Sequence, residues 1–215
     1  MASCAAHNSG LTCVGKLFVI SAPSGAGKTS LVRALLAARP KLVVSVSHTT
    51  RIPRAQEVEG RDYHFVTPAR FHQLVGEGAF LEHACVFDNF YGTGRAQIQD
   101  QLAAGKDVLL EIDWQGAQQV RRAMPACKTI FILPPSRAAL EQRLRERRTD
   151  SAETIARRLT DAAADMAHYN EFDFLVLNDQ FERAAQDLGA ILDGGGQELR
   201  ATRPELHDLI RSLAR

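Results

Sequence analysis

The 215-residue sequence lacks a long apolar run and has only four cysteines. No apolar run approaches the roughly 20 residues that a membrane-spanning helix needs. No two cysteines form a Cys-x-x-Cys pair, and no histidine lies at metal-ligand spacing from them, so no zinc-binding pattern is present. The cysteines are Cys4, Cys13, Cys85 and Cys127. We expect them to be the reduced thiols of a cytosolic protein.

The sequence also lacks a net charge of one sign. Its 26 Lys and Arg residues nearly balance 25 Asp and Glu residues, which gives +1. The net charge therefore gives no indication that the protein binds nucleic acid or a membrane. Any electrostatic contribution to function must come from local clusters of charged residues. Residues 1–14 lack a basic segment followed by an apolar one, so we expect no signal peptide. We expect a cytoplasmic monomer or homo-oligomer.

What the sequence does contain is an alternation of apolar and amphipathic segments. This pattern is typical of an α/β fold, a mainly parallel sheet flanked by helices. Residues 16–21 predict a buried first strand, and residues 29–39 predict a helix. Further strands are expected at 42–46, 107–112, 129–133 and 174–177, and further helices at 95–104, 114–123, 137–148, 151–169 and 181–192.

Residues 47–94 have a different composition, with more polar and basic residues. Short strands at 63–66 and 80–87 and a helix at 68–77 predict an inserted α+β subdomain. The predicted organisation is an extension (1–14), a core (15–46, 95–135 and 170–195), the insertion (47–94), a basic lid (about 136–169) and a tail (196–215), helical from Pro204.

The most specific motif directly follows the first predicted strand. It fits the Walker A pattern, with alanine at its first position, and runs Ala22, Pro23, Ser24, Gly25, Ala26, Gly27, Lys28 and Thr29. Two glycines allow backbone N–H groups to surround phosphate oxygens, and the following helix adds its positive end. Lys28 can reach the β- and γ-phosphates, and the Thr29 hydroxyl can bind Mg²⁺. The alternative is a glycine turn without a ligand.

Acidic residues end the strand predicted at 107–112. Glu111 and Asp113 lie where the carboxyl ends of parallel strands line a ligand crevice. They could hold the water shell of Mg²⁺ or bind a base rich in hydrogen-bond donors. The alternative is a pair of solvated strand-end acids.

A second group of residues suggests a phosphate acceptor. Arg51 and Arg54, three residues apart, can grip one phosphate, and Tyr63 and Tyr91 can add hydroxyl donors. Glu82 is a lone acid in an apolar stretch, and guanine offers N1–H and N2–H₂ donors on one edge. The alternatives are loop charges, core aromatics and a surface acid.

The densest basic cluster follows residue 142. It comprises Arg143, Arg145, Arg147, Arg148, Arg157 and Arg158. Arginines on a mobile lid can stabilise the charge of a transferring phosphoryl group and exclude water. The alternative is an exposed helix with i,i+4 pairs such as Glu141–Arg145.

Taken together, the motifs resemble the bacterial type of guanylate kinase, a family of P-loop nucleoside monophosphate kinases. The resemblance runs from about residue 15 to 195 and rests on S-H-T-T-R-x-P-R, F-L-E-H-A, Y-G-T and L-L-E-I-D-W-Q-G-A, in the family's order. It implies an ATP:GMP phosphotransferase of purine metabolism that uses Mg²⁺ and also accepts dGMP.

The resemblance also implies residue roles. Arg51, Arg54, Tyr63 and Tyr91 would hold the GMP phosphate, and Ser47, Glu82, Thr93 and Asp113 would bind the base. Lys28, Arg51, Arg145 and Arg158 would act in phosphoryl transfer, with Arg147 the next lid candidate. Asn178 would lie near the adenine, unless it is only a turn residue. Glu111 replaces the family's more frequent Asp, and Arg148 replaces a frequent Gly, so both roles stay open.

Two other functions remain to be weighed. One is a kinase for AMP, UMP or dTMP, against which Glu82 and Asp113 predict guanine. The other is a scaffold-type guanylate-kinase-like domain that binds phosphopeptides without catalysis. Such modules usually have a degraded P-loop, whereas Lys28 and Thr29 are intact here.

Overall fold

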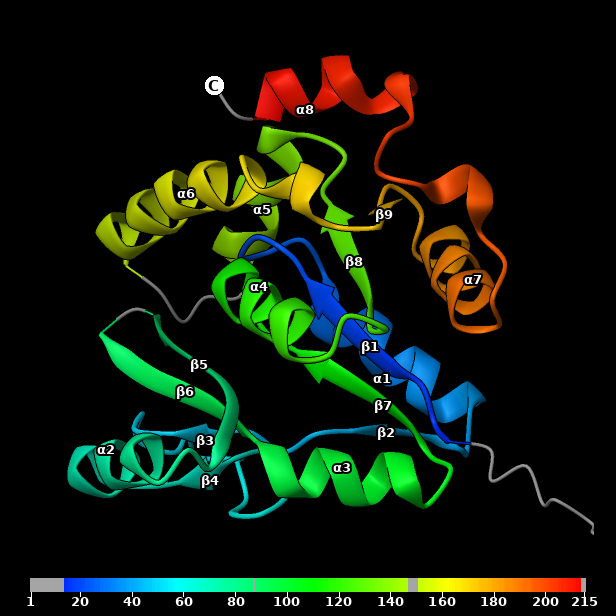
Figure 1. The fold of residues 1–215 in the computed structure, drawn as a ribbon. Helices are drawn as coiled ribbons and strands as arrows, with labels where there is room; N and C mark the ends of the chain where they lie inside the picture. The colour runs from blue at the N-terminus through cyan, green and yellow to red at the C-terminus, as the bar shows by residue number, and fades with distance from the viewer. Residues whose placement is uncertain (1–13, 87, 147–150, 214–215) are drawn as a thin grey trace, which may run out of the picture.

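A five-stranded parallel sheet forms the centre of the molecule (Figure 1). The structure is a computed structural model that describes residues 14–86, 88–146 and 151–213. The strands are β1 (Leu17–Ser21), β2 (Leu42–Val44), β7 (Asp107–Glu111), β8 (Lys128–Leu133) and β9 (Phe174–Leu177), in the order β2-β7-β1-β8-β9. The α/β fold expected from the alternating pattern is therefore confirmed.

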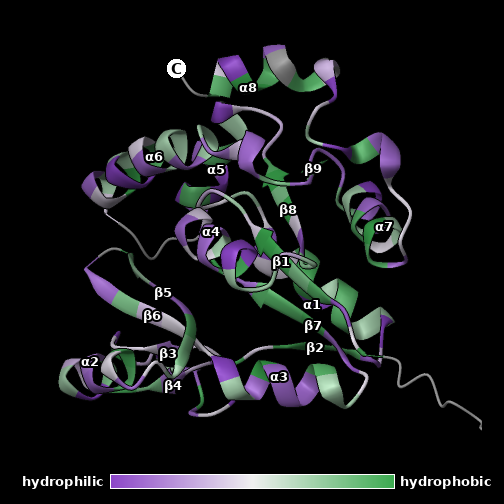
Figure 2. Cartoon of the chain, in the orientation of Figure 1, coloured by the Kyte–Doolittle hydropathy of each residue, from purple (hydrophilic) through white to green (hydrophobic). Residues whose placement is uncertain are grey.

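Alternate side chains of each central strand enter two different apolar cores. Phe18 and Ile20 of β1 pack on one side of the sheet, and Leu17 and Val19 pack on the other. Because both faces are covered, the central residues of these strands are apolar, as the green of β1, β7 and β8 in Figure 2 shows.

Helices cover both faces of the sheet. The core with Phe18 includes residues of α1 (Lys28–Ala38), α5 (Arg137–Glu146), α6 (Ala152–Met166) and α7 (Phe181–Leu192). The core with Val19 includes residues of α3 (Arg95–Ala103), α4 (Trp114–Ala123), α6 and α8 (His207–Leu213). This arrangement places the start of α1 at the carboxyl end of β1, beside the ends of β7 and β8.

A second, four-stranded sheet lies beside the first. Its strands are β3 (His48–Thr49), β4 (His64–Phe65), β5 (Phe80–Val86) and β6 (Asn89–Gly94), in the order β4-β3-β6-β5. Helix α2 (Pro68–Gly76) begins at Thr67, whose side chain accepts a hydrogen bond from the Arg70 N–H. The sequence did not predict β3 or β6. β3 has only two residues, and β6 contains two glycines, so pairing with neighbouring strands rather than propensity forms them.

The segments after the central helices differ slightly from the predictions. The helix expected at 151–169 ends at Met166 and is followed by a 3₁₀ turn, Tyr169–Glu171. The tail has two 3₁₀ turns (Gln197–Leu199 and Pro204–Leu206) before α8, whose Ile210 and Leu213 are buried in the chain's own core. Residues 1–13, Arg147, Arg148 and the helix break at 149–150 lie outside the described residues. Within the described part, no helix is long and apolar enough to cross a membrane.

Candidate active site

The loop between β1 and α1 adopts a backbone that requires glycine. Gly25 and Gly27 have φ angles of 91° and 92°, in the left-handed region. A Cβ atom on Gly27 would also lie 2.4 Å from the Nδ2 atom of Asn178. Both glycines of the Walker A motif are thus needed to shape the loop, as the sequence predicted.

Two side chains support this loop from behind. The Asn178 amide donates a hydrogen bond of 2.7 Å to the Ala26 carbonyl, and Arg143 donates to the Ala26 and Asn178 carbonyls at 3.4 and 3.1 Å. Asn178 is 5% exposed and does not line the cavity described below. The structure thus gives it a role in positioning the loop, and its contact to adenine stays a prediction. The sequence did not indicate this role for Arg143. Its partners, Ala26 and Asn178, lie far from it along the chain, so no local pattern reveals these contacts.

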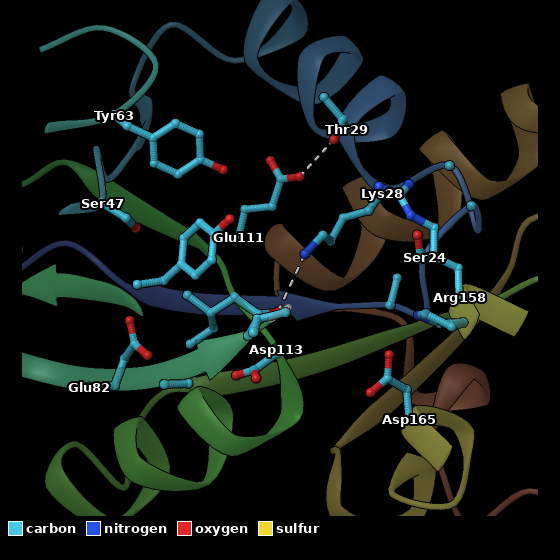
Figure 3. Close-up of a pocket in the computed structure, with 18 of the residues that line it drawn as sticks. Ser24, Lys28, Thr29, Ser47, Tyr63, Glu82, Glu111, Asp113, Arg158 and Asp165 are labelled. Atoms are coloured by element: carbon cyan, nitrogen blue, oxygen red, sulfur yellow. Dashed lines mark hydrogen bonds between the residues drawn. The ribbon is translucent and has the colours of Figure 1, made fainter. Parts of the chain in front are cut away.

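At the cavity side of the loop, Lys28 and Thr29 point toward the ends of the central strands (Figure 3). The Thr29 hydroxyl donates a hydrogen bond of 2.9 Å to Glu111 Oε1, and Lys28 Nζ lies 3.4 Å from the Ile112 carbonyl oxygen. These contacts place Glu111 beside the start of α1 and the phosphate loop. A hydroxyl and a carboxylate oxygen at this position fit Mg²⁺, which is usually held by one or two protein oxygens together with phosphates.

Glu82 lies on β5 on the other side of the cavity and is 3% exposed. The Thr93 hydroxyl donates a hydrogen bond of 2.5 Å to Glu82 Oε1, and the Ser47 and Thr93 hydroxyl oxygens are 3.5 Å apart. Burial, with a smaller effect from the Asp113 charge, raises the pKa of Glu82 to about 7, against the opposing hydrogen bond from Thr93. The structure therefore brings Ser47, Glu82 and Thr93 together, with a buried carboxylate at their centre.

Asp113 forms the N-cap of α4. Its Oδ1 atom accepts a hydrogen bond of 2.8 Å from the Gly116 N–H, and burial raises its pKa. As an N-cap it fixes the start of α4 next to Glu82. Asp113, which the resemblance predicts to bind the base, thus also has a structural function.

Asp165 of α6 lines the same cavity, and the sequence had not indicated it. Burial first, and then the charges of Asp113 and Asp161, raise its pKa to about 6. Asp165 follows Arg158 by seven residues, which is about two helical turns, so both side chains project from one face of α6. That spacing was the available signal for Asp165, and Figure 3 shows both residues at the cavity.

The predicted phosphate-binding residues lie in and beside the cavity wall. Arg54, Tyr63 and Tyr91 line the cavity, whereas Arg51 does not. Arg51 Nη2 pairs with Glu57 Oε1 at 2.7 Å, and this contact raises the pKa of Arg51 and lowers that of Glu57. The other Glu57 oxygen accepts a hydrogen bond of 2.8 Å from the Arg54 N–H. Glu57, which the sequence did not single out, thus holds the loop that carries both arginines.

The lid candidates divide into two groups. Arg158 lines the cavity, whereas Arg145 is 62% exposed and pairs with Glu141 at 2.6 Å on the outside of α5. The structure does not bring Arg145 into the cavity, and Arg147 lies outside the described residues. The i,i+4 pair that was the alternative for Arg145 is present, and its role in catalysis stays a prediction.

One cavity of about 300 Å³ joins these parts. Residues of the loop 22–29 line one side, and Glu111 and Asp113 lie in the middle. The predicted acceptor residues that line the other side are Ser47, Arg54, Tyr63, Glu82 and Tyr91, whereas Thr93 lies behind Glu82 and outside the lining. A phosphate loop and a buried, hydroxyl-bound carboxylate thus open into one space. The guanylate kinase family model matches residues 14–194.

The chain belongs to the guanylate kinase family.

Curated relatives support this placement over nearly the whole chain. A guanylate kinase of Methylococcus capsulatus is 56% identical over 199 residues, covering 93% of this chain and 98% of that protein. A guanylate kinase of Nitrosococcus oceani is 57% identical over 199 residues, covering 93% and 96%. The family and the P-loop fold expected from the motifs are therefore confirmed.

A solved structure of the same family has a similar fold. The guanylate kinase from Anaplasma phagocytophilum is 35% identical, with a TM-score of 0.70, and the match covers 94% of this chain and 96% of that chain. The family placement makes this chain an enzyme, a nucleoside monophosphate kinase.

Proposed function

We propose that the cavity binds ATP and GMP side by side and that the chain transfers the γ-phosphoryl group of ATP to GMP, giving ADP and GDP. The observation that carries this function is that the phosphate loop and the buried Glu82, whose carboxylate Thr93 binds from behind, line one cavity. The first is a site for nucleotide phosphates, and the second offers a carboxylate to a base edge with two donors. Guanine has such an edge, whereas AMP, UMP and dTMP do not.

On the donor side, the loop 22–29 holds the ATP phosphates through backbone N–H groups of the residues after Pro23, and Lys28 contacts the β- and γ-phosphates. The left-handed glycines and the support from Asn178 favour this role, because they fix the loop before a nucleotide binds. Thr29 and Glu111 would hold Mg²⁺, which would supply positive charge to the ATP phosphates. We assign Glu111 to the metal rather than to the base, and its carboxylate oxygen, 2.9 Å from the Thr29 hydroxyl, supports this role.

On the acceptor side, Glu82, Thr93, Ser47 and Asp113 bind guanine, while Arg51, Arg54, Tyr63 and Tyr91 hold the GMP phosphate. A GMP phosphate oxygen attacks the γ-phosphorus in line, the bond to the bridging oxygen breaks, and ADP leaves. Positioning and charge stabilisation supply most of the rate in this chemistry, so no covalent intermediate is needed. These contacts are to base and phosphate, which also predicts that dGMP is accepted.

Residues about 136–169 form the lid in this proposal. Arg158 reaches the transferring phosphoryl group from α6, and Arg145 joins it when the lid closes and excludes water. Residues 47–94 form the acceptor subdomain, and the rest of residues 15–195 forms the core. Since ATP and GMP are cytoplasmic metabolites, we place the reaction in the cytoplasm, as a step of purine nucleotide metabolism.

The experiment that tests this function measures ADP production with ATP, Mg²⁺ and each nucleoside monophosphate in turn. We expect fast turnover with GMP, slower turnover with dGMP, and little with AMP, UMP or dTMP. Preference for another monophosphate would contradict the base-binding roles of Glu82 and Asp113. No turnover by folded protein would instead favour a phosphopeptide-binding module, despite the intact phosphate loop.

Changing Glu111 to alanine should weaken the binding of Mg²⁺ in the active site. We expect kcat to fall by about tenfold or more, and the Mg²⁺ concentration for half-maximal rate to rise, because one carboxylate ligand is lost. The measurement is a Mg²⁺ titration at saturating ATP and GMP. Asp107→Ala, at the other end of the same strand, is the control and should keep the wild-type Mg²⁺ dependence. A raised KM for GMP with unaltered Mg²⁺ dependence would assign Glu111 to the base instead.

A further inference from the structure

Gly116, in the first turn of α4, lies directly against the Glu82 carboxylate. A Cβ atom built on Gly116 would be 2.5 Å from Glu82 Oε2 and 3.1 Å from its Cδ atom. Real Cβ atoms do not approach other atoms so closely, so a side chain here forces a movement. The other carboxylate oxygen, Oε1, is held by Thr93. The carboxylate is thus enclosed between β6 and the start of α4.

Helix α4 is held in place, so the carboxylate is the group that must move. The Gly116 N–H is bound by the Asp113 side chain at 2.8 Å. One turn further on, the Gln119 side chain accepts from the His83 N–H at 3.2 Å and donates to the His83 carbonyl at 2.8 Å. His83 is the next residue after Glu82, so these bonds tie α4 to β5 beside the carboxylate.

The backbone of Gly116 does not itself require glycine. Gly116 lies within α4, and its φ is not in the left-handed region that excludes other residues. Alanine is the better helix former at such a position. The other close atom, Ile112 Cδ1 at 3.2 Å, is the end of a side chain and can shift by a few tenths of an ångström. The close approach of the Glu82 carboxylate is therefore the reason that residue 116 must be glycine.

We propose that Gly116 is a positioning residue for guanine recognition, because its missing side chain lets the Glu82 carboxylate lie against α4 in the orientation that binds the base edge. This inference rests on the proposed function of Glu82 and deepens it. Any side chain at residue 116 displaces or rotates the carboxylate away from guanine while leaving the phosphate loop unchanged. The effect is thus specific for GMP.

The test compares Gly116→Ala with wild type in steady-state kinetics for both substrates. We expect KM for GMP to rise by about tenfold, with kcat and KM for ATP changed less than about twofold, the pattern of lost ground-state binding. Gly189→Ala is the matched control. It is also a helical glycine, in α7, and the atoms nearest to its Cβ would be those of the Arg39 guanidinium, at 2.8 Å, away from the cavity. It should keep wild-type constants.

A double variant tests whether the effect passes through Glu82. In Glu82→Asp the carboxylate is one methylene shorter and retreats from α4, so Gly116→Ala should raise KM for GMP less in that background than in wild type. If Gly116→Ala alone does not fold, the double variant should fold, since the clash is relieved.

Three kinetic results would overturn the inference. They are an unchanged KM for GMP in a folded Gly116→Ala protein, equal rises of KM for GMP and ATP, and effects of the two substitutions that simply multiply. Persistent unfolding of the double variant would also overturn it. Wild-type protein that does not use GMP at all would instead refute the proposed function, and the two failures are therefore distinguishable.

Discussion

Replacing Lys28 by methionine should lower kcat by about 10²- to 10³-fold, the usual cost of removing one group that stabilises charge in a transition state. Lys28 is expected to contact the β- and γ-phosphates, where charge develops as the bond to the leaving oxygen breaks. Methionine has a similar length and no charge, so the packing changes little. Steady-state kinetics at saturating ATP and GMP measure the effect.

The Lys28→Met protein should remain folded. The hydrogen bond that the structure records for Lys28 Nζ is a long one, 3.4 Å to the Ile112 carbonyl oxygen, and its loss should cost little stability. Urea unfolding of the variant should therefore match wild type within about 1 kcal/mol. Lys16→Met, at an exposed position before β1, is the control and should change neither kinetics nor stability. A folded Lys28→Met enzyme with near-normal kcat would refute the role.

The phosphate loop and the central sheet could be predicted from the sequence because their signals are local. Apolar strands, left-handed glycines and the helix that follows them lie within consecutive residues, and Phe174–Leu177, Phe181–Leu192 and Trp114–Ala123 have the predicted bounds. The support of the loop by Arg143 and Asn178 could not be predicted in the same way. It joins residues that lie 117 and 152 positions from Ala26, and no periodicity records such a contact.

On the acceptor side, even more of the contacts join residues that no local sequence pattern connects. Strand β6 reads as a loop because of its two glycines, although Thr93 within it donates the hydrogen bond to Glu82. The resemblance placed Glu82 and Thr93 together at the base, but their direct hydrogen bond follows only from the pairing of β5 with β6. Glu57 and Asp165 carry no motif, and their roles follow from the ion pair with Arg51 and from the face of α6.

Replacing Glu82 by glutamine should raise KM for GMP by about 10- to 100-fold, since hydrogen bonds to a charged group are worth about 1.5–3 kcal/mol. Glutamine keeps one acceptor oxygen but presents an amide donor to a base edge that also donates. KM for ATP should stay near wild type. Glu77→Gln, an exposed position at the end of α2 in the same segment, is the control and should not change KM for GMP. An unaltered KM for GMP in Glu82→Gln would refute base recognition by this residue.

The same substitution should stabilise the free protein at alkaline pH. The pKa of Glu82 is raised from 4.5 to about 7 in the folded state by burial. Between these two values the native protein binds a proton that the unfolded chain has released, so stability is lost as pH rises from about 4.5 and levels off above about 7. Glutamine does not titrate. The advantage of Glu82→Gln over wild type should therefore be small near pH 5.

At pH 8 the cost of ionising the buried Glu82 is complete, and a shift of this size corresponds to on the order of 3 kcal/mol. Glu82→Gln should then be the more stable protein, although it binds GMP less well. Urea unfolding of both proteins at pH 5 and pH 8, without nucleotides, measures this, because all other titrating groups are shared. An equal stability difference at the two pH values would mean that Glu82 is not the titrating group. Together with a raised KM for GMP in Glu82→Gln, the expected result would indicate that the carboxylate is retained against stability because guanine recognition needs its charge.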